Sequence, residues 1–313
     1  MLLVTPDQVF LFTDSRYTIA AHAECVDVDI VITRDLLGEA LKRCVGSELV
    51  VEGRNLSILQ YQEIQRIQPA LNLRAEKGIV EKARVVKDEQ ELALIAQACA
   101  ISTDALTELC QTIQVGDSER QLARRLEDLM RDRGADDLAF PTILATGPHT
   151  AIPHHEPTNR TVNRGELIKI DFGAMVNGYR SDCTRMLVCG QPSQWQSELF
   201  DEGKYAQLAG RSAVSAGVTL AQVDQAARSA LAEKDMGDLF THGLGHGVGL
   251  DIHEDPFLAK NDSVYLESNT VVTVEPGAYI ENVGGVRIED TIVVTDSGYR
   301  NLTVFPYDLV SVG

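Results

Sequence analysis

Apolar residues in the middle of the chain recur at helical spacing behind two clear helix start signals. Asp88 is followed three residues later by Glu91, and Ser118 is followed in the same way by Gln121. Such pairs form a capping box, because each side chain accepts a hydrogen bond from the other residue's backbone N–H. We therefore predict helices that begin near residues 88 and 118. Their buried stripes are Leu92, Ile95 and Ala96, and Leu122, Leu126, Leu129 and Met130.

The second helix start returns later in the chain. Matching residues stand 101 positions apart, in the pairs Gly116 and Gly217, Ser118 and Thr219, Gln121 and Gln222, Leu122 and Val223, and Met130 and Leu231. This offset is too long for a solenoid repeat, whose units are about 20–50 residues. It predicts two related halves, each a helix pair that leads into strands.

Runs rich in Val, Ile and Thr follow each predicted helix pair, as is typical of strands. They are Leu167–Gly173, Arg180–Val188, Thr270–Glu275 and Gly285–Val294. Before residue 80 the pattern is weaker and predicts strands at Val9–Phe12 and Glu48–Val51 and a helix at Leu36–Cys44. The predicted fold class is α+β, with helices on one face of a curved, mainly antiparallel sheet and a small domain in front.

Four carboxylates interrupt or end these apolar runs: Asp171, Asp182, Glu275 and Glu289. An ionised carboxylate in a protein core costs several kcal/mol unless it is compensated, and nearby basic residues are too few for four. Either each acid points at water from a strand end, or the four surround divalent cations, two of which would cancel their charge.

Strand alternation indicates which neighbours share a face with these acids. It places Thr184 with Asp182, Thr273 with Glu275, and Arg287 with Glu289, as groups suited to orienting the carboxylates. It turns Cys183 the other way, into packing.

A glycine-rich segment, Thr241–His253, adds three histidines to the acids. Glycines at this density let a backbone approach a ligand closely, and a histidine among them is a candidate metal ligand. The alternative is a flexible loop in which the histidines are incidental.

Composition narrows the class of protein. The chain has 313 residues, with 28 Lys and Arg against 46 Asp and Glu and a net charge of −18. This balance argues against nucleic-acid and anionic-membrane partners. No apolar run approaches the roughly 18 residues that span a bilayer. The first residues lack a signal-peptide pattern, and the six cysteines are scattered, so we expect a cytoplasmic protein with free thiols.

Several of these segments together resemble a known family. KIDFGAMVNGYRSDCTR, THGLGHGVGLDIHEDP, VTVEPGAYI and GGVRIED are similar to the pita-bread metallopeptidases, in particular Xaa-Pro aminopeptidases and prolidases. The resemblance implies a pita-bread catalytic domain over residues 83–313. LFTDSRYTIAAHAE resembles the additional N-terminal domain of the Xaa-Pro peptidases, so residues 1–82 are expected to be a truncated, creatinase-like α/β domain.

The resemblance also implies a metal site and its ligands. Asp182 and Glu289 would bridge two ions, Asp171 would hold one of them, and His246 with Glu275 the other. Oxygen-rich ligation with one imidazole suits Mn²⁺, and would also accept Co²⁺ or Zn²⁺. Glu275 is further expected to accept a proton from the attacking water.

Other residues take roles around the substrate by the same resemblance. AIPHHEP implies a substrate-binding histidine at His154, whereas His149 and His155 are expected to be surface or supporting residues. His253 corresponds to a second active-site histidine and His242 to a third. Tyr279 and Arg287 would act as accessory residues in the proton-relay and substrate network.

The implied activity is hydrolysis of an N-terminal Xaa-Pro bond in small peptides by a homodimer. Several prolidases carry an arginine for the substrate carboxylate where this chain has Phe257, with Lys260 as a substitute cation, so we expect an Xaa-Pro aminopeptidase. The alternative is a prolidase restricted to dipeptides. A non-catalytic binding protein and a metal-independent amidinohydrolase of the creatinase type are further alternatives, both disfavoured by the complete ligand set.

Overall fold

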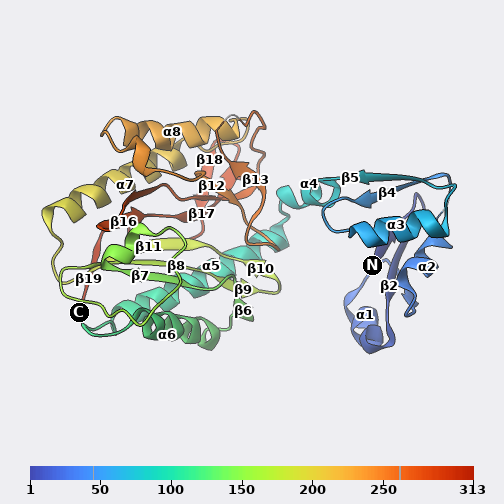
Figure 1. Ribbon diagram of the computed structural model, residues 1–313, viewed down its shortest axis with the longest axis horizontal. Helices are drawn as coiled ribbons and strands as arrows, with labels where there is room; N and C mark the ends of the chain where they lie inside the picture. The colour runs from blue at the N-terminus through green and yellow to red at the C-terminus, as the bar shows by residue number, and fades with distance from the viewer. Residues whose placement is uncertain (45, 261) are drawn as a thin grey trace. The chain divides into compact units, whose positions relative to one another are not determined.

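The computed structural model describes residues 1–44, 46–260 and 262–313 (Figure 1). The chain divides into two compact units, Met1–Glu81 and Lys82–Gly313. We describe each unit by itself, and α4 (Ile79–Val85) spans the boundary between them.

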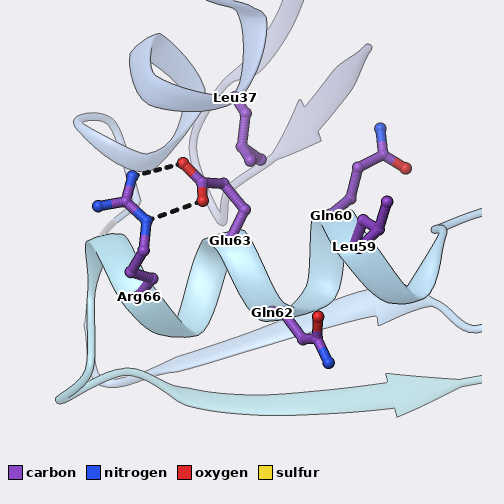
Figure 2. A pocket seen from close by; sticks show the side chains of 6 residues that line it. All are labelled: Leu37, Leu59, Gln60, Gln62, Glu63 and Arg66. Atoms are coloured by element: carbon purple, nitrogen blue, oxygen red, sulfur yellow. Dashed lines mark hydrogen bonds and ion pairs between the residues drawn. The ribbon is translucent and has the colours of Figure 1, made fainter.

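The first unit contains two small sheets and three helices. Its elements are β1 (Leu2–Val4), β2 (Val9–Thr13), α1 (Thr18–Glu24), β3 (Asp29–Ile32), α2 (Leu36–Leu41), β4 (Glu48–Glu52), α3 (Ile58–Ile67) and β5 (Asn72–Glu76). β2 pairs antiparallel with β1 and parallel with β3, and β4 pairs parallel with β5. A hollow beside α3 is lined by Leu37 and residues of that helix, where Glu63 and Arg66 pair with each other at 2.6 Å (Figure 2). No predicted site residue lies there.

The second unit begins with a helix pair, α5 (Glu89–Cys110) and α6 (Glu119–Asp132). Both predicted capping boxes are present, with Asp88 and Ser118 at the N-caps. Length and composition alone would allow α5 to cross a membrane, but much of it is buried inside the protein, which is typical of a core helix.

Strands follow, and then a second helix pair with more strands. The elements are β6 (Asp137–Leu138), β7 (Ile143–Thr146), β8 (Leu167–Phe172), β9 (Ala174–Val176), β10 (Tyr179–Arg180), β11 (Cys183–Cys189), α7 (Gln194–Ser212), α8 (Leu220–Ala232), β12 (Gly245–Gly247), β13 (Glu254–Leu258), β14 (Val271–Val274), β15 (Gly277–Ile280), β16 (Gly284–Arg287), β17 (Asp290–Thr295), β18 (Gly298–Asn301) and β19 (Val310–Val312).

Two sheets carry most of the strands in this unit, in the orders β19-β11-β8-β7 and β13-β12-β14-β17-β18. All of their pairings are antiparallel except that of β11 with β19. The α5–α6 and α7–α8 pairs flank the strands on two sides (Figure 1). Each helix pair contributes to its own apolar core, and Cys183 is buried in the first, as its strand face predicts.

The predicted internal repeat is visible in the backbone at the start of α6 and α8. Gly116 N donates to Val162 O and Gly217 N to Leu266 O, each at 2.9 Å. Both glycines have positive φ, +94° and +83°, a conformation that glycine adopts without a steric penalty. The two helix N-caps repeat this backbone pairing. Ser118 forms an isolated antiparallel β-bridge with Thr161, and Thr219 forms one with Tyr265.

Two predicted strands break at a carboxylate. The prediction of one strand over Gly285–Val294 is wrong, because β16 pairs with β15 whereas β17 pairs with β14. Glu289 lies at the point where the chain leaves one pairing for the other. The run Arg180–Val188 likewise breaks at Ser181 and Asp182, between β10 and β11. Both acids therefore lie beside strand ends and are nevertheless buried, at 4% exposure for Asp182 and 1% for Glu289.

The core of the first half gives a stability prediction. Leu126 on α6 is fully buried, so Leu126→Ala should lower the free energy of unfolding by about 2–5 kcal/mol. Trp195 on α7 is the only tryptophan, and its fluorescence during urea unfolding reports on this unit. Leu208→Ala on α7, at a side chain 48% exposed, is the control and should cost less than about 0.5 kcal/mol. Equal losses in the two variants would contradict this packing.

Candidate metal centre

A pocket in the second unit gathers most of the predicted site residues. Its lining includes His154, His242, His246, His253, Glu275 and Arg287. These come from segments up to 133 residues apart, brought together where the strands of the two halves meet.

Each candidate ligand stands on or directly beside a strand. Asp171 is near the end of β8, Asp182 immediately precedes β11, and His246 is in the middle of β12. Glu275 directly follows β14, and Glu289 directly precedes β17. The first half therefore contributes two carboxylates, and the second half contributes the histidine and two carboxylates.

The ligand atoms converge. One ligand atom each from Asp182, His246 and Glu289 lie within 4.8 Å of one another. His246 Nε2 is 3.5 Å from Asp182 Oδ2 and 3.3 Å from Glu275 Oε1. Asp171 is joined to the group through Arg287, with which it forms a hydrogen-bonded ion pair.

His246 is oriented for ligation by its other ring nitrogen. Nδ1 lies 3.0 Å from Gly247 O, and a carbonyl oxygen only accepts, so Nδ1 carries the proton. Burial lowers the pKa of His246, but the hydrogen bond and charge of Glu275 outweigh it and raise that pKa, which favours a proton on Nε2 until a metal ion replaces it. The bond from Nδ1 to Gly247 leaves Nε2 facing Asp182 and Glu275, as the nitrogen that would bind the ion. A hydrogen bond of this kind fixes the tautomer of many metal-binding histidines.

Two observations fit these residues to divalent cations. Asp171 Oδ1 is buried and has no hydrogen-bond partner among the described residues. Burial, together with the charges of neighbouring carboxylates, raises the pKa of Asp182 and that of Glu289 well above the usual range. Negative charge is thus costly here without a cation, and the donor set of four carboxylates and one imidazole suits a hard or borderline divalent ion.

Glu275 differs electrostatically from the other acids. Burial alone would raise its pKa, but the hydrogen bond and charge of His246, with the charges of Arg287 and His242, lower it to about 2. Glu275 is therefore ionised at neutral pH, the state that both a metal ligand and a proton acceptor require.

Threonines and arginine orient the acids, in part across strands. Thr273 Oγ1 donates to Glu275 Oε1 at 3.2 Å, on the face that alternation predicts. Thr184, expected beside Asp182, instead donates to Glu289 Oε2 at 2.6 Å. Arg287, expected beside Glu289, instead pairs with Asp171 and donates to Thr184 Oγ1 at 3.0 Å. The partners therefore lie on adjacent strands of the opposite half.

A hydrogen-bonded chain runs from the acids to the pocket wall. Arg287 Nη1 donates to the Tyr279 hydroxyl at 3.1 Å, and that hydroxyl lies 3.0 Å from His242 Nε2. His242 Nδ1 is occupied by Gly243 O at 2.8 Å, so Nε2 accepts from the tyrosine. Burial lowers the pKa of His242, which keeps the ring neutral at pH 7. The three accessory residues thus form one connected path.

The two remaining histidines, His154 and His253, also line the pocket. His154 is exposed into the pocket on the long loop after β7. The His253 ring packs edge-on against His246, with centroids 4.3 Å apart. Burial, with the charge of His246, lowers the pKa of His253, so it too is neutral at pH 7. The segment that carries His253 is held from behind by the ion pair of Glu254 with the buried Lys87, at 2.7 Å.

The glycines on both sides of His246 are also required for strand packing. A Cβ on Gly245 would lie 2.1 Å from Thr273 O, and one on Gly247 would lie 2.5 Å from Asp255 O. The absent side chains allow β12 to pack between its neighbouring strands, which sets the position of His246. Gly245 and Gly243 also line the pocket, so the expectation that glycines let the backbone approach a ligand stays a prediction.

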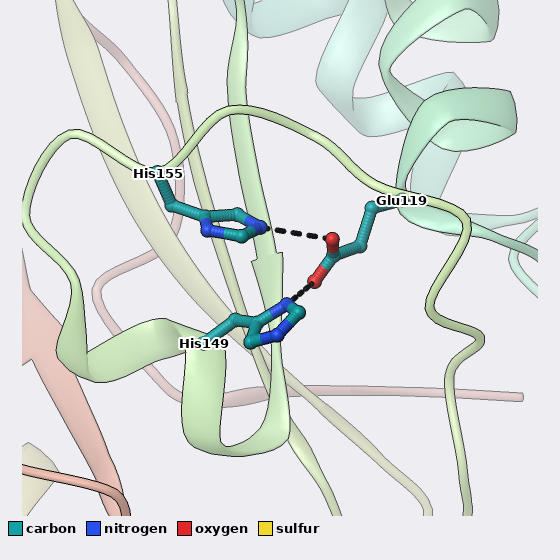
Figure 3. A group of neighbouring side chains, drawn as sticks. All are labelled: Glu119, His149 and His155. Atoms are coloured by element: carbon teal, nitrogen blue, oxygen red, sulfur yellow. Dashed lines mark hydrogen bonds and ion pairs between the residues drawn. The ribbon is translucent and has the colours of Figure 1, made fainter.

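A second cluster, which the sequence did not indicate, lies behind His154. Glu119, the first residue of α6, is fully buried and meets His149 and His155 (Figure 3). Its Oε1 accepts from His149 Nδ1 and its Oε2 from His155 Nε2, each at 2.9 Å. An acid in the first turn of a helix usually looks like a surface residue. The repeat contains a signal, because the position 101 residues on is Leu220, typical of a buried site.

Comparison with known proteins decides the family. Residues 93–296 match the model of Metallopeptidase family M24, and residues 1–86 match the Creatinase/Prolidase N-terminal domain. The chain belongs to metallopeptidase family M24. It is therefore a hydrolase, and the metal-dependent class predicted from the sequence is confirmed.

Relatives of this metallopeptidase span almost the whole chain. The Xaa-Pro dipeptidase of Pyrococcus horikoshii is 34% identical over 99% of this chain and 88% of its own length. A solved Xaa-Pro dipeptidase from Bacillus anthracis superposes with a TM-score of 0.95 at 34% identity, covering 99% of this chain and 88% of that one. An X-Pro aminopeptidase from Thermotoga maritima gives 0.93 at 35%, covering 99% and 90%. These likenesses confirm the predicted pita-bread fold.

Carboxylate repulsion in this metallopeptidase gives a metal-dependent prediction. In Glu289→Gln, metal-free protein should unfold at the same or a higher temperature than wild type, because the amide replaces a carboxyl whose charged form is disfavoured by burial and by the neighbouring acids. Mn²⁺ at 100 times its dissociation constant should stabilise wild type by about 2.7 kcal/mol and the variant clearly less. Thermal unfolding with and without Mn²⁺ measures both, with Asp308→Asn, an exposed acid, as control. A variant stabilised by Mn²⁺ as much as wild type would exclude Glu289 as a ligand.

Glu119 gives a pH prediction. Burial would raise its pKa, but hydrogen bonds from Thr158, His155 and His149 outweigh it and lower the pKa from 4.5 to about 2. A lowered pKa stabilises the fold above the unfolded value, so about 3 kcal/mol should be present above pH 4.5 and lost as the pH falls towards 2. The charged or titratable groups facing it are His149, His155 and Arg160.

Urea unfolding between pH 7 and 3 tests this. Glu119→Gln should be less stable than wild type at pH 7, and the difference should shrink below pH 4.5. If the difference in the free energy of unfolding between wild type and Glu119→Gln stays constant down to pH 3, the lowered pKa of Glu119 is wrong.

Proposed function

We propose that this metallopeptidase is a prolidase that hydrolyses Xaa-Pro dipeptides with Mn²⁺ as its metal. The observation that carries the proposal is a pocket lined by two of the candidate ligands, His246 and Glu275, together with His154 and His253. Asp182 and Glu289 converge on His246 beside this pocket, and Asp171 pairs with Arg287, which lines it. The relatives supply the substrate class, since two proteins that align with almost the whole chain are named Xaa-Pro dipeptidases. These names favour a prolidase restricted to dipeptides, the alternative in the sequence analysis, over the Xaa-Pro aminopeptidase that we expected there.

The residues around the pocket have separate tasks in this proposal. When bound, two divalent ions held by Asp171, Asp182, His246, Glu275 and Glu289 supply the Lewis acid for amide hydrolysis. Glu275, ionised at neutral pH, accepts the proton of the attacking water and delivers it to the leaving proline nitrogen. His154 and His253 face the scissile carbonyl and stabilise the oxyanion that develops there.

The path through Arg287, Tyr279 and His242 acts beside this centre. Arg287 holds Asp171 and, through the tyrosine hydroxyl, fixes the His242 ring. His242 therefore presents a neutral, oriented ring to the pocket. We propose that it positions the leaving-group part of the peptide.

An Xaa-Pro aminopeptidase is the second candidate, and Phe257 favours it. This side chain is 44% exposed and lines the pocket at the position where the resemblance led us to look for a carboxylate-binding arginine. Lys260, the cation suggested as a substitute, is exposed and is absent from the described pocket lining. The solved relative named X-Pro aminopeptidase is consistent with this reading. Cytoplasmic location and a homodimer stay predictions from the sequence.

Hydrolysis of matched peptides separates the two candidates. Metal-stripped protein is assayed on Ala-Pro and Ala-Pro-Ala, with and without added Mn²⁺. A prolidase should cleave the dipeptide and leave the tripeptide intact, because only in the dipeptide does the proline itself carry the free C-terminal carboxylate. Cleavage of both would identify an aminopeptidase, and cleavage of neither by protein shown to hold two ions would exclude both.

Variants make the same assay residue-specific. Asp171→Asn should lower Mn²⁺-dependent activity by at least about 100-fold, because it removes a ligand oxygen and its charge. Asp308→Asn makes the same chemical change at an exposed acid and should leave activity unchanged. Equal activity in the two variants would show that Asp171 has no part in the centre.

A further inference from the structure

One carboxylate joins both ends of the loop that carries His154. The loop runs from Thr146 to Thr158, and Glu119 stands between its two legs. Oε1 accepts from the leading leg, from Thr146 N at 2.8 Å, Thr146 Oγ1 at 3.1 Å and His149 Nδ1 at 2.9 Å. Oε2 accepts from the trailing leg, from His155 Nε2 and Thr158 N at 2.9 Å and Thr158 Oγ1 at 2.6 Å.

These contacts account for the cluster without a second metal ion. Each carboxylate oxygen already accepts three hydrogen bonds, which exceeds its two lone pairs. His149 Nδ1 and His155 Nε2 must carry protons to donate, so neither atom is free to ligate. The cluster is a saturated hydrogen-bond network that holds a loop (Figure 3).

The internal repeat shows that the fold itself does not need an acid at this position. Leu220 takes the corresponding place at the start of α8 and is also buried, at 1% exposure. The backbone around the two residues is the same, since Glu119 N donates to Arg160 O and Leu220 N to Val264 O, each at 3.0 Å. A leucine suffices where the neighbouring segment carries no catalytic residue. Of the two corresponding positions, the one that contacts the His154 loop is therefore the one that carries an acid.

The loop is also held from its inner side. The buried Lys169 Nζ donates to the carbonyl oxygens of Thr150, Ile152 and Pro153, at 3.2, 2.5 and 3.2 Å. Arg287 Nη1 donates to Pro153 O at 3.1 Å. His154 and His155 are consecutive and face opposite ways, the first into the pocket and the second onto Glu119. A displacement of His155 therefore moves His154.

We infer that Glu119 is a positioning residue, whose carboxylate holds the two legs of the Thr146–Thr158 loop so that His154 meets the scissile carbonyl. The inference rests on the proposed function and deepens it, since it names the group through which His154 is set. Glu119 itself is absent from the described lining of the pocket. A displacement of a catalytic group by about 1 Å is enough to cost roughly 100-fold in rate.

A double-mutant cycle on the substrate that wild type cleaves tests the inference. In Glu119→Gln the amide oxygen can accept from one leg, but its NH₂ group then faces the donors of the other leg. We expect kcat to fall by about 10–100-fold with KM little changed, because a group acting in the transition state is displaced. In a His154→Ala background the same substitution should change kcat by less than about twofold, since the residue it positions is absent.

Leu126→Ala separates positioning from loss of stability. Leu126 lies on the same helix as Glu119, and the apolar cluster in which it packs includes no described residue of the Thr146–Thr158 loop. The kcat of Leu126→Ala should therefore equal that of wild type at a temperature where both are folded. Losses in kcat that add fully in the Glu119→Gln, His154→Ala double variant would overturn the inference. A fall in kcat for Leu126→Ala as large as that for Glu119→Gln would overturn it as well.

Hydrogen exchange supplies a readout without activity. In metal-free Glu119→Gln, the backbone amides of Thr146 and Thr158 should exchange faster than in wild type, while those of β11 keep their rates. Unchanged exchange at both threonines would overturn the inference. If wild type cleaves neither Ala-Pro nor Ala-Pro-Ala, the proposed function fails, and the exchange result still decides whether Glu119 holds the loop.

Discussion

The second unit depends on one electrostatic constraint, which is that four carboxylates, three of them buried and Glu275 half-buried, lie close together beside one pocket. Ionised carboxylates in a low-dielectric interior repel one another and lose their hydration, so the arrangement is stable only with positive charge among them. Within the described residues that charge comes from Arg287 and, when protonated, His246. The excess of negative charge is the reason that the site fits divalent cations.

The surrounding structure keeps these acids in place from behind. Threonine hydroxyls and a guanidinium donate to the carboxylates, and hydrogen bonds of this kind, with one charged partner, are stronger than neutral ones. Asp290, next to Glu289, is held in turn by Arg185, Gln207 and Tyr307, so the chain is fixed on both sides of the ligand. These hydrogen bonds restrict the ligand carboxylates before an ion binds, so less of their conformational freedom is lost on binding.

The sequence predicted much of this because the main signals are local. Helix starts at Asp88 and Ser118 need only residues three positions apart, and the acids stand out among apolar neighbours. The partners of Thr184 and Arg287 lie across strands, so alternation along one strand does not identify them. The strand break at Glu289 depends on which neighbours pair with each side of it. Glu119 escaped notice because burial of a helix-start acid is decided by a loop about 30 residues away.

Each half of the second unit supplies a hydrogen-bond donor to a ligand carboxylate of the other half, which bears on the evolution of this enzyme. Thr184 from the first half serves an acid of the second, and Arg287 from the second serves an acid of the first. Neither half is chemically complete, although both are built to one plan. If both halves descend from one ancestral unit, that unit would have formed a complete site only as a dimer of two identical copies. Fusion into one chain would then have allowed the two copies to diverge, so that one now has leucine where the other has glutamate.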